Sequence, residues 1–252
     1  MVNCAIACSR ERCFWLKMKR ACDRQAVVFT CEHATCFVPK QFEKLFAGRE
    51  SVLRSHRGWD PGTLDLGNAL AGHYGFPLFA TKVSRLLVEV NRSLWHRQLF
   101  SEFSGVLDAE SKQTILNRYY DSHRNAVGTW IESQISAGAR VLHLSLHSFT
   151  PILNGVERNA DIGLLYDPRR LGERDICERW NQNFGRLIPH WRVRKNYPYL
   201  GRSDGFTTFL RKRFNAEQYC GIELEINQRL VLDRNFQDRI PHIVKTIEDI
   251  VD

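Results

Sequence analysis

The chain has 252 residues, a length that suits one α/β domain or two small ones and allows a core without disulfide staples. Its hydrophobic fraction of 43% and charged fraction of 25% are those of an ordinary globular protein and argue against general disorder. The net charge of +8 favours anionic partners, but the scattered basic residues carry no nucleic-acid-binding signature, and no apolar run is long enough to span a membrane.

The beginning of the chain is rich in cysteine, since six of the eight cysteines fall within the first 36 residues. Their irregular spacing contains no C-x-x-C pair, and disulfide scaffolds are mostly short secreted domains, so we expect reduced thiols in a cytoplasmic protein. Charges interrupt every apolar stretch of residues 1–25, which excludes a secretory signal but leaves a basic transit peptide open. We expect residues 1–25 to be a poorly ordered extension and residues 26–252 to form a single domain.

Predicted strands and helices alternate along the rest of the chain. Short apolar runs rich in β-formers predict strands at residues 26–31, 76–80, 86–90, 141–147, 162–166 and 221–226. Apolar residues at helical spacing predict helices at residues 64–71, 111–136, 171–187, 206–214 and 240–251. Residues 196–204 are rich in Tyr, Gly and Pro and should form a loop. This alternation is typical of an α/β domain with a mainly parallel sheet.

Polar side chains stand where several predicted strands end. In open α/β sheets, ligands bind at the carboxyl ends of the strands, so residues at these ends should converge in one crevice. The residues at these positions are Glu32, His33, Asn91, Arg92, His147, Ser148, Glu223 and Glu225. Glu223 and Glu225 are two apart in a strand and therefore share a face, where buried carboxylates need a metal, an arginine or a proton.

This combination of side chains is chemically coherent. Imidazole and carboxylate groups are ligands for a zinc-like divalent ion, which keeps one position for water in a catalytic site. The ion lowers the pKa of that water, and a nearby carboxylate can take its proton. An arginine can bind a substrate carboxylate through two parallel hydrogen bonds.

Each residue also has a simpler interpretation. A single histidine at a strand end is more often a surface or hydrogen-bonded residue than a ligand, and His143 is expected to be packed inside its strand. Asp60 precedes Pro61, the usual arrangement of a helix N-cap, and capping is the better interpretation from this pattern alone. Arg92 could form a structural salt bridge. Cys31 near His33 is a weaker nucleophile candidate, because a buried strand cysteine is usually inert.

Other catalytic signatures are missing from the sequence. It contains no G-x-S-x-G elbow, no phosphate-binding loop and no G-x-G-x-x-G fingerprint, which argues against serine-hydrolase, ATP and NAD chemistry.

Six short motifs in a fixed order resemble the N-formylglutamate amidohydrolase family, which is similar in turn to zinc carboxypeptidases and aspartoacylases. The resemblance covers roughly residues 26 to 230, and each motif alone is weak. The motifs are CEHA at 31–34, HRGWDPG at 56–62, SRLLVEVNR at 84–92, LHSF at 146–149, RNADIG at 158–163 and LEINQ at 224–228.

The resemblance implies a three-layer α/β sandwich with a mixed, mainly parallel sheet, like that of zinc carboxypeptidases. It implies hydrolysis of the amide bond of a small anionic N-formyl or other N-acyl amino acid, such as N-formyl-L-glutamate. It also implies one divalent metal ion, with zinc the expected identity. The implied roles are metal ligation by His33, Asp60 and His147, general-base catalysis by Glu225, and substrate binding by Asn91, Arg92 and Arg158. Asp161 and the loop 199–205 are further candidates for the pocket wall.

Departures from the related pattern leave alternatives open. The carboxypeptidase pattern has an acid three residues after its first histidine, where this chain has Cys36, so Glu32 competes with Asp60 as third ligand. Asn227 and Arg229 stand where the family commonly has Arg and then Asp, which leaves the exact substrate open. The competing functions are a metallo-carboxypeptidase, another N-acyl amino acid deacylase and a non-catalytic basic binding module. The sequence predicts no oligomeric state.

Overall fold

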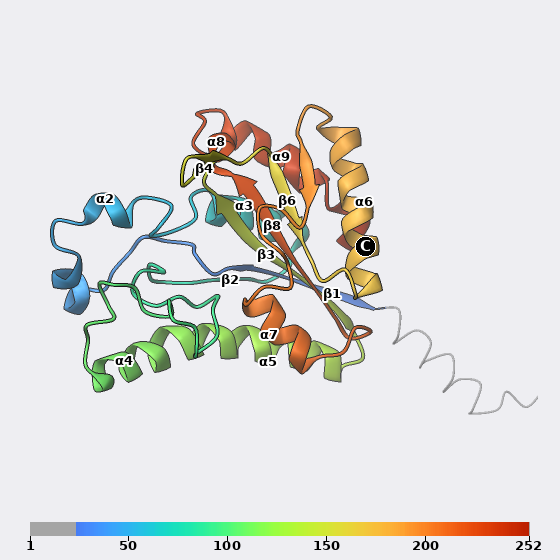
Figure 1. Ribbon diagram of the computed structural model, residues 1–252. Coiled ribbons are helices and arrows are strands. Elements are labelled where there is room, and N and C mark those ends of the chain that lie inside the picture. Colours follow the sequence, from blue (N-terminus) through green and yellow to red (C-terminus); the bar gives the residue numbers. More distant parts are fainter. Residues whose placement is uncertain (1–23, 252) are drawn as a thin grey trace, which may run out of the picture.

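A computed structural model describes residues 24–251 (Figure 1). The predicted N-terminal extension, residues 1–25, lies outside the described residues except for its last two positions. Gln25 of that pair already belongs to the first strand, one residue earlier than predicted.

The described residues form a six-stranded sheet in the order β2-β1-β3-β8-β6-β7. Strands β2, β1, β3 and β8 run parallel to one another, whereas β6 pairs antiparallel with β8 and parallel with β7. The mixed, mainly parallel sheet that we predicted is therefore confirmed. The strand bounds are β1 Gln25–Cys31, β2 Leu78–Ala80, β3 Arg140–Phe149, β6 Ile162–Leu165, β7 Val193–Lys195 and β8 Tyr219–Asn227, with a separate hairpin of β4 Ile152–Leu153 and β5 Val156–Glu157.

Helices cover both faces of the sheet and complete the three layers (Figure 1). One face packs against α3 (Thr63–Tyr74), α6 (Leu171–Leu187), α9 (Phe236–Lys245) and α10 (Glu248–Val251). The opposite face packs against α5 (Ser122–Ser136) and α7 (Phe206–Arg213). Period-two alternation along the strands places Leu142, Leu144 and Leu146 on the first face and His143, Ser145 and His147 on the second. The second face therefore carries a polar row that leads to the carboxyl end of the sheet.

A separate apolar cluster builds what we call the small lobe, residues 38–58 and 83–120. It includes the 3-10 helix η1 (Lys40–Phe46), α2 (Glu50–Leu53) and α4 (Ala109–Ile115), which continues through the π-helical segment η2 (Leu116–Asp121) into α5. Phe42, Phe46, Leu87, Val90 and Tyr120 lie in its core. In Figure 1 the small lobe lies to the left of the sheet, on the side opposite α6.

The strand predicted at residues 86–90 is wrong. This segment forms consecutive turns, in which the Leu87 N–H donates to the Ser84 carbonyl and the Arg92 N–H donates to the Glu89 carbonyl. Its apolar side chains are buried in the core of the small lobe and not in the sheet. An apolar run bounded by polar residues indicates that the segment is buried. Burial alone does not distinguish a strand from a packed turn.

The remaining predictions agree well with the structure at most positions. The predicted helix at 171–187 coincides with α6, and the predicted helix at 240–251 is instead divided into α9 and α10. The helical stretch predicted at 111–136 is present, with the π-helical segment inside it. No helix among residues 24–251 has both the length and the apolar character needed to cross a membrane.

His143 should make the stability of the fold depend on pH. Its buried ring lies 2.7 Å from both Thr30 Oγ1 and Tyr219 Oη, and burial lowers its pKa to about 4. Since the ordinary pKa is about 6.5, the unfolded chain binds this proton more readily than the folded chain between these values. The contribution is complete above about pH 6.5 and decreases as the pH falls toward about 4, by up to about 3 kcal/mol.

The His143→Gln variant isolates this contribution. Urea unfolding of both proteins should show the largest difference in unfolding free energy at pH 7 and a smaller difference at pH 4.5. A difference that stays constant over this range would contradict the prediction.

Candidate metal-binding site

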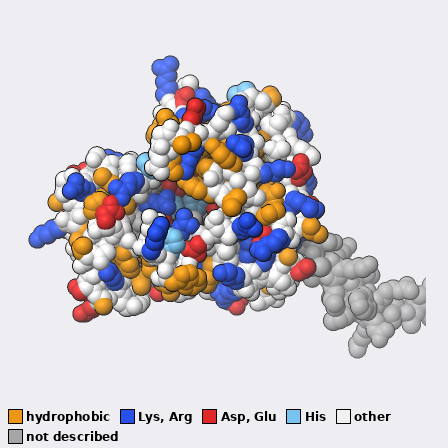
Figure 2. Space-filling model, in the orientation of Figure 1, with side chains coloured by type: hydrophobic (Ala, Val, Ile, Leu, Met, Phe, Trp, Pro, Cys, Tyr) orange, Lys and Arg blue, Asp and Glu red, His pale blue; other side chains and the backbone are white. Residues whose placement is uncertain are grey.

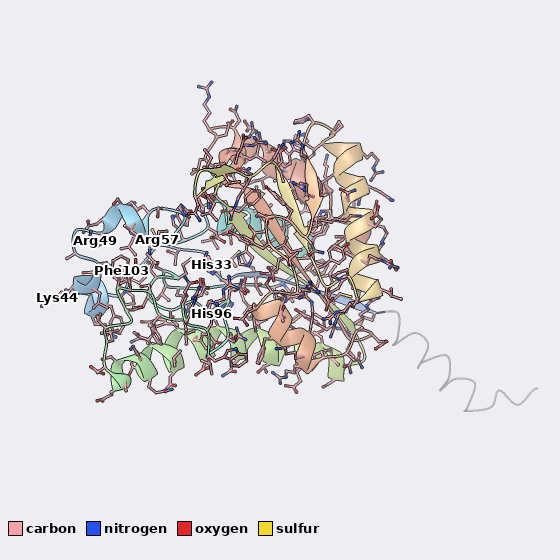
Figure 3. The ribbon with its side chains drawn as sticks, viewed as in Figure 1. His33, Lys44, Arg49, Arg57, His96 and Phe103 are labelled. Atoms are coloured by element: carbon pink, nitrogen blue, oxygen red, sulfur yellow. The ribbon has the colours of Figure 1, made fainter. Side chains whose placement is uncertain are left out.

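Three buried side chains from distant parts of the chain meet at one oxygen atom. His33 directly follows β1, Asp60 precedes α3 and His147 lies near the end of β3. Asp60 Oδ2 is 3.1 Å from His33 Nδ1 and 3.0 Å from His147 Nδ1, and the two imidazole ring centroids are 5.0 Å apart. His33 lies near the centre of the molecule in Figure 3, between the sheet and the small lobe.

Asp60 is not the helix cap that the Asp-Pro pattern favoured. The N-cap of α3 is Gly62, and no side chain caps the helix there. The Asp60 backbone N–H donates to the His33 carbonyl at 2.9 Å, which turns the carboxylate toward the two imidazoles. Asp60 Oδ2 also accepts a hydrogen bond from the Ser148 backbone N–H at 3.3 Å. The cap interpretation is therefore wrong, and Asp60 belongs to the convergent group.

The second nitrogen of each imidazole faces an acceptor. His33 Nε2 lies 2.5 Å from Glu89 Oε1, and the same carboxylate accepts two hydrogen bonds from Arg85. His147 Nε2 lies 2.9 Å from Ser145 Oγ. Both Nε2 atoms are thus placed to donate, which leaves the lone pairs of both Nδ1 atoms directed at Asp60 Oδ2.

This donor set fits a divalent metal ion. Two nitrogen lone pairs and a carboxylate oxygen repel one another unless a cation lies among them, and the same three groups are ordinary ligands of zinc. Among residues 24–251, His33, Asp60 and His147 form the group whose ligand atoms all lie within 4.8 Å of one another.

The electrostatics of the site also favour positive charge between these groups. Burial would lower the pKa of His147, but its contacts with Asp60 and Glu32 outweigh burial and raise that pKa well above its ordinary value. Burial would raise the pKa of Asp60, but His33, His147 and Arg85 together hold it below the ordinary range.

Glu225 stands beside the metal-binding group on the neighbouring strand. In the register of β3 and β8 it is the partner of His147, and its buried Oε2 has no hydrogen-bond partner within residues 24–251. Burial raises the pKa of this carboxyl to about 8, with His147 opposing the shift and Asp60 and Glu223 adding to it. Glu223 lies on the same strand face, as predicted, and accepts a hydrogen bond from Thr207 Oγ1 at 2.5 Å.

Asn91 and Arg92 reach the site from the small lobe and not from a strand end. Asn91 Oδ1 accepts a hydrogen bond from the Phe206 N–H at 2.7 Å, and Arg92 donates to the Asp204 carbonyl. The Tyr120 hydroxyl donates to the Arg92 carbonyl at 2.7 Å and fixes the backbone at this point.

Arg158 is a buried cation without a partner of opposite charge. Its Nη1 has no hydrogen-bond partner in the described chain, and its guanidinium stacks 4.9 Å from the Tyr199 ring centroid and 5.9 Å from that of Phe149. Both rings line the cleft described next. Asp161, the other candidate from this motif, accepts a hydrogen bond from Arg229 Nη2 at 2.7 Å. Neither Arg158 nor Asp161 is among the residues that line this cleft.

A cleft of about 960 Å³ is lined by the metal-binding group and by Glu225, Asn91 and Arg92. Figure 2 shows it as a hollow with acidic and histidine side chains inside and arginine and lysine side chains around its edge. The predicted loop contributes Tyr199, Leu200, Ser203 and Asp204. The cleft is also lined by four residues for which the sequence indicated no role, namely His56, Arg57, His96 and Phe100. Their chain positions gave no signal, because the small lobe that carries them was not predicted.

The sequence model of the N-formylglutamate amidohydrolase family matches residues 25–232. The chain belongs to this family. The match spans every motif on which the resemblance rested, from the Cys-Glu-His-Ala segment to the late Glu225.

Two solved structures share this fold. A gene product from Agrobacterium tumefaciens is 24% identical, with a TM-score of 0.74 over 92% of this chain and 94% of that chain. N-formylglutamate amidohydrolase from Ralstonia eutropha JMP134 is 19% identical, with a TM-score of 0.67 over 91% of this chain and 94% of that one. Among the curated proteins, none matches this chain.

We expect the convergent group to bind one zinc ion. Replacing His147 with Ala removes one of three ligand atoms and should abolish stoichiometric binding in a titration of the metal-free protein with Zn²⁺. His96→Ala is the matched control, because it removes an imidazole from the same cleft without touching this group. Full zinc occupancy in the His147 variant would reject it as a ligand.

Proposed function

We propose that the protein is a metal-dependent amidohydrolase that cleaves the amide bond of an N-formyl or other N-acyl amino acid, with N-formyl-L-glutamate the first candidate. Membership of the family supports the reaction class. The observation that carries the proposal is the buried His33–Asp60–His147 group beside the unpartnered carboxylate of Glu225. The family comparison alone does not supply this geometry.

In the proposed reaction the metal ion and Glu225 have different roles. His33, Asp60 and His147 would hold a zinc ion, which would supply Lewis acidity toward the amide carbonyl and lower the pKa of water. Glu225 takes the proton of the attacking water and passes it to the leaving amine nitrogen. Burial raises the pKa of this carboxyl above that of an ordinary glutamate, which makes its carboxylate a stronger base toward the water proton.

Arginines of the cleft bind the carboxylates of the substrate. Arg92 and Asn91 lie beside the metal-binding group, and Asn91 Nδ2 is 3.5 Å from His147 Nε2. Arg158, which stacks on the cleft residues Tyr199 and Phe149, adds a second guanidinium, whose Nη1 has no hydrogen-bond partner within the described chain. Two such groups suit an acylated amino acid with two carboxylates, because a guanidinium binds a carboxylate in a bidentate manner.

The volume of the cleft favours a second candidate, an N-acyl amino acid whose acyl group is larger than formyl. Pockets that hold drug-sized ligands measure about 300–1,000 Å³, and this cleft lies near the upper end of that range. A profile of N-formyl, N-acetyl and N-succinyl amino acids, together with peptides carrying a free C-terminus, separates these deacylases from a metallo-carboxypeptidase. Purification of the protein without zinc would instead favour a non-catalytic binding module.

We also propose that residues 26–252 act as one amidohydrolase domain in the cytoplasm. The central sheet supports the first part, because its strands come from both ends of the described chain. The described cysteines Cys31, Cys36, Cys177 and Cys220 are free thiols, which suits a reducing compartment.

Glu225→Gln tests the general base. The amide cannot accept the water proton, so formate release from N-formyl-L-glutamate should fall roughly 10²–10⁴-fold. Metal analysis of the same preparation should give the zinc content of the wild type. Unchanged turnover would remove Glu225 from this role.

Arg158→Ala tests substrate binding. The loss of a charged hydrogen-bond donor should lower kcat/KM for N-formyl-L-glutamate about 10–100-fold, mainly through a higher KM. Arg97→Ala is the control, since Arg97 is an exposed arginine that lines the cleft and does not stack on Tyr199 or Phe149. Equal kinetics for the two variants would show that Arg158 does not bind the substrate.

A further inference from the structure

The carboxylate of Glu32 lies behind the ring of His147, on the side away from Asp60. Its Oε2 accepts a hydrogen bond from Ser145 Oγ at 2.7 Å and lies 3.3 Å from His147 Nε2. Asp60 contacts the other ring nitrogen, Nδ1, at 3.0 Å. Glu32 and Asp60 therefore occupy opposite sides of one imidazole, and Glu32 lies outside the group of ligand atoms that converges at Asp60.

The hydrogen bonds fix where the ring carries its proton. Ser145 has one hydroxyl proton, and it points to Glu32 Oε2. Ser145 Oγ is therefore an acceptor toward His147 Nε2, which is 2.9 Å away. This contact places a proton on Nε2, so Nδ1, which faces Asp60, is the nitrogen available to a metal ion. The order His147–Ser145–Glu32 thus selects the tautomer that can ligate a metal at Nδ1.

The register of the sheet creates this contact. Thr30 of β1 pairs with Ser145 of β3. Glu32 comes two positions after Thr30, and His147 comes two positions after Ser145, so the two side chains lie next to each other. Glu32 is 1% exposed, and burial of an acidic side chain to this degree is unfavourable without partners. Its second oxygen, Oε1, has no hydrogen bond within residues 24–251 and lies 3.7 Å from His123 Nε2.

Glu89 holds His33 in a comparable way, but with different support. Its carboxylate is clamped by Arg85 and accepts a hydrogen bond from the Asn91 backbone N–H at 3.1 Å. Within residues 24–251 no arginine pairs with Glu32, which is contacted instead by the Ser145 hydroxyl and the imidazoles of His147 and His123. The carboxylate that orients His147 is therefore held by fewer charged groups than the one that orients His33. Removal of the Glu32 carboxylate should change the orientation of the His147 ring.

We propose that Glu32 is a positioning residue that acts through Ser145 to hold His147 as the Nε2–H tautomer, with Nδ1 free for the metal. This inference rests on the proposed metal-dependent function. It also gives Glu32 a role different from the third-ligand role that the sequence left open.

The test measures zinc affinity and the tautomer of His147 directly. Metal-free wild type, Glu32→Gln and Glu32→Asp are titrated with Zn²⁺ against a fluorescent chelator. The Gln variant keeps the size of the side chain but replaces the carboxylate with a neutral amide, which can donate as well as accept. The Asp variant keeps the negative charge, but its shorter side chain moves the carboxylate away from Ser145. Both variants should bind zinc about 10–100-fold more weakly, as expected for loss of an outer partner of a metal histidine.

Glu102→Gln is the matched control. It removes a carboxylate that lines the same cleft but pairs with Arg57 at 2.5 Å and has no contact with the metal-binding histidines. Its zinc affinity should equal that of the wild type. Equal zinc affinities of Glu32→Gln and Glu102→Gln would overturn the proposal, because the loss of Glu32 would then have either no effect or only the effect of removing a negative charge.

Two-bond ¹H–¹⁵N correlation spectra of the zinc-loaded wild type give the tautomer of His147. The proposal requires a proton on Nε2, and a proton on Nδ1 would overturn it even if the Glu32 variants fail to fold. A wild type that binds no zinc would refute the proposed metal site itself. Zinc binding by the wild type with unaffected Glu32 variants would refute only the role of Glu32.

Discussion

The carboxylate of Asp60 contacts His33 and His147 through a single oxygen, and this convergence determines the chemistry of the whole cleft. Each imidazole is turned so that its Nε2 faces an acceptor and its Nδ1 faces Asp60. Three electron-rich atoms at this separation repel one another unless a positive charge lies among them, and burial strengthens this repulsion because water does not screen it. The rest of the site can be understood as the support that keeps these atoms together.

That support comes from two differently built parts of the molecule. Parallel strands bring His33, His147 and Glu225 to one end of the sheet, where their spacing is fixed by the register of β1, β3 and β8. The small lobe contributes Arg85, Glu89, Asn91 and Arg92 from tightly packed turns. A rigid sheet thus positions the catalytic candidates, while the turns supply the groups that orient them and face the substrate.

The sequence predicted the parts of the site that depend on a strand ending at the right residue. His33, His147 and Glu225 could be found this way, because period-two alternation places them on one face and the strands end near them. Asp60 was ambiguous, since an Asp-Pro pair is also a normal helix start and only its contact with the His33 backbone decides between these meanings. The turns at residues 86–90 were mistaken for a strand because their apolar side chains are buried in a second core. The pairing of Glu32 with Ser145 requires the register between two strands 113 residues apart, which no local pattern contains.

The division of the site between sheet and small lobe affects the mechanics of the protein. Glu89 from the lobe contacts His33 from the sheet, so an ion bound at His33 would be coupled to both parts at once. Occupancy of the site would then add a crosslink between the two hydrophobic cores to the hydrogen bonds that Asn91 and Arg92 already make across the cleft. Loss of the ion would loosen the lobe first, and the walls of the substrate cleft would lose their shape before the sheet itself unfolds.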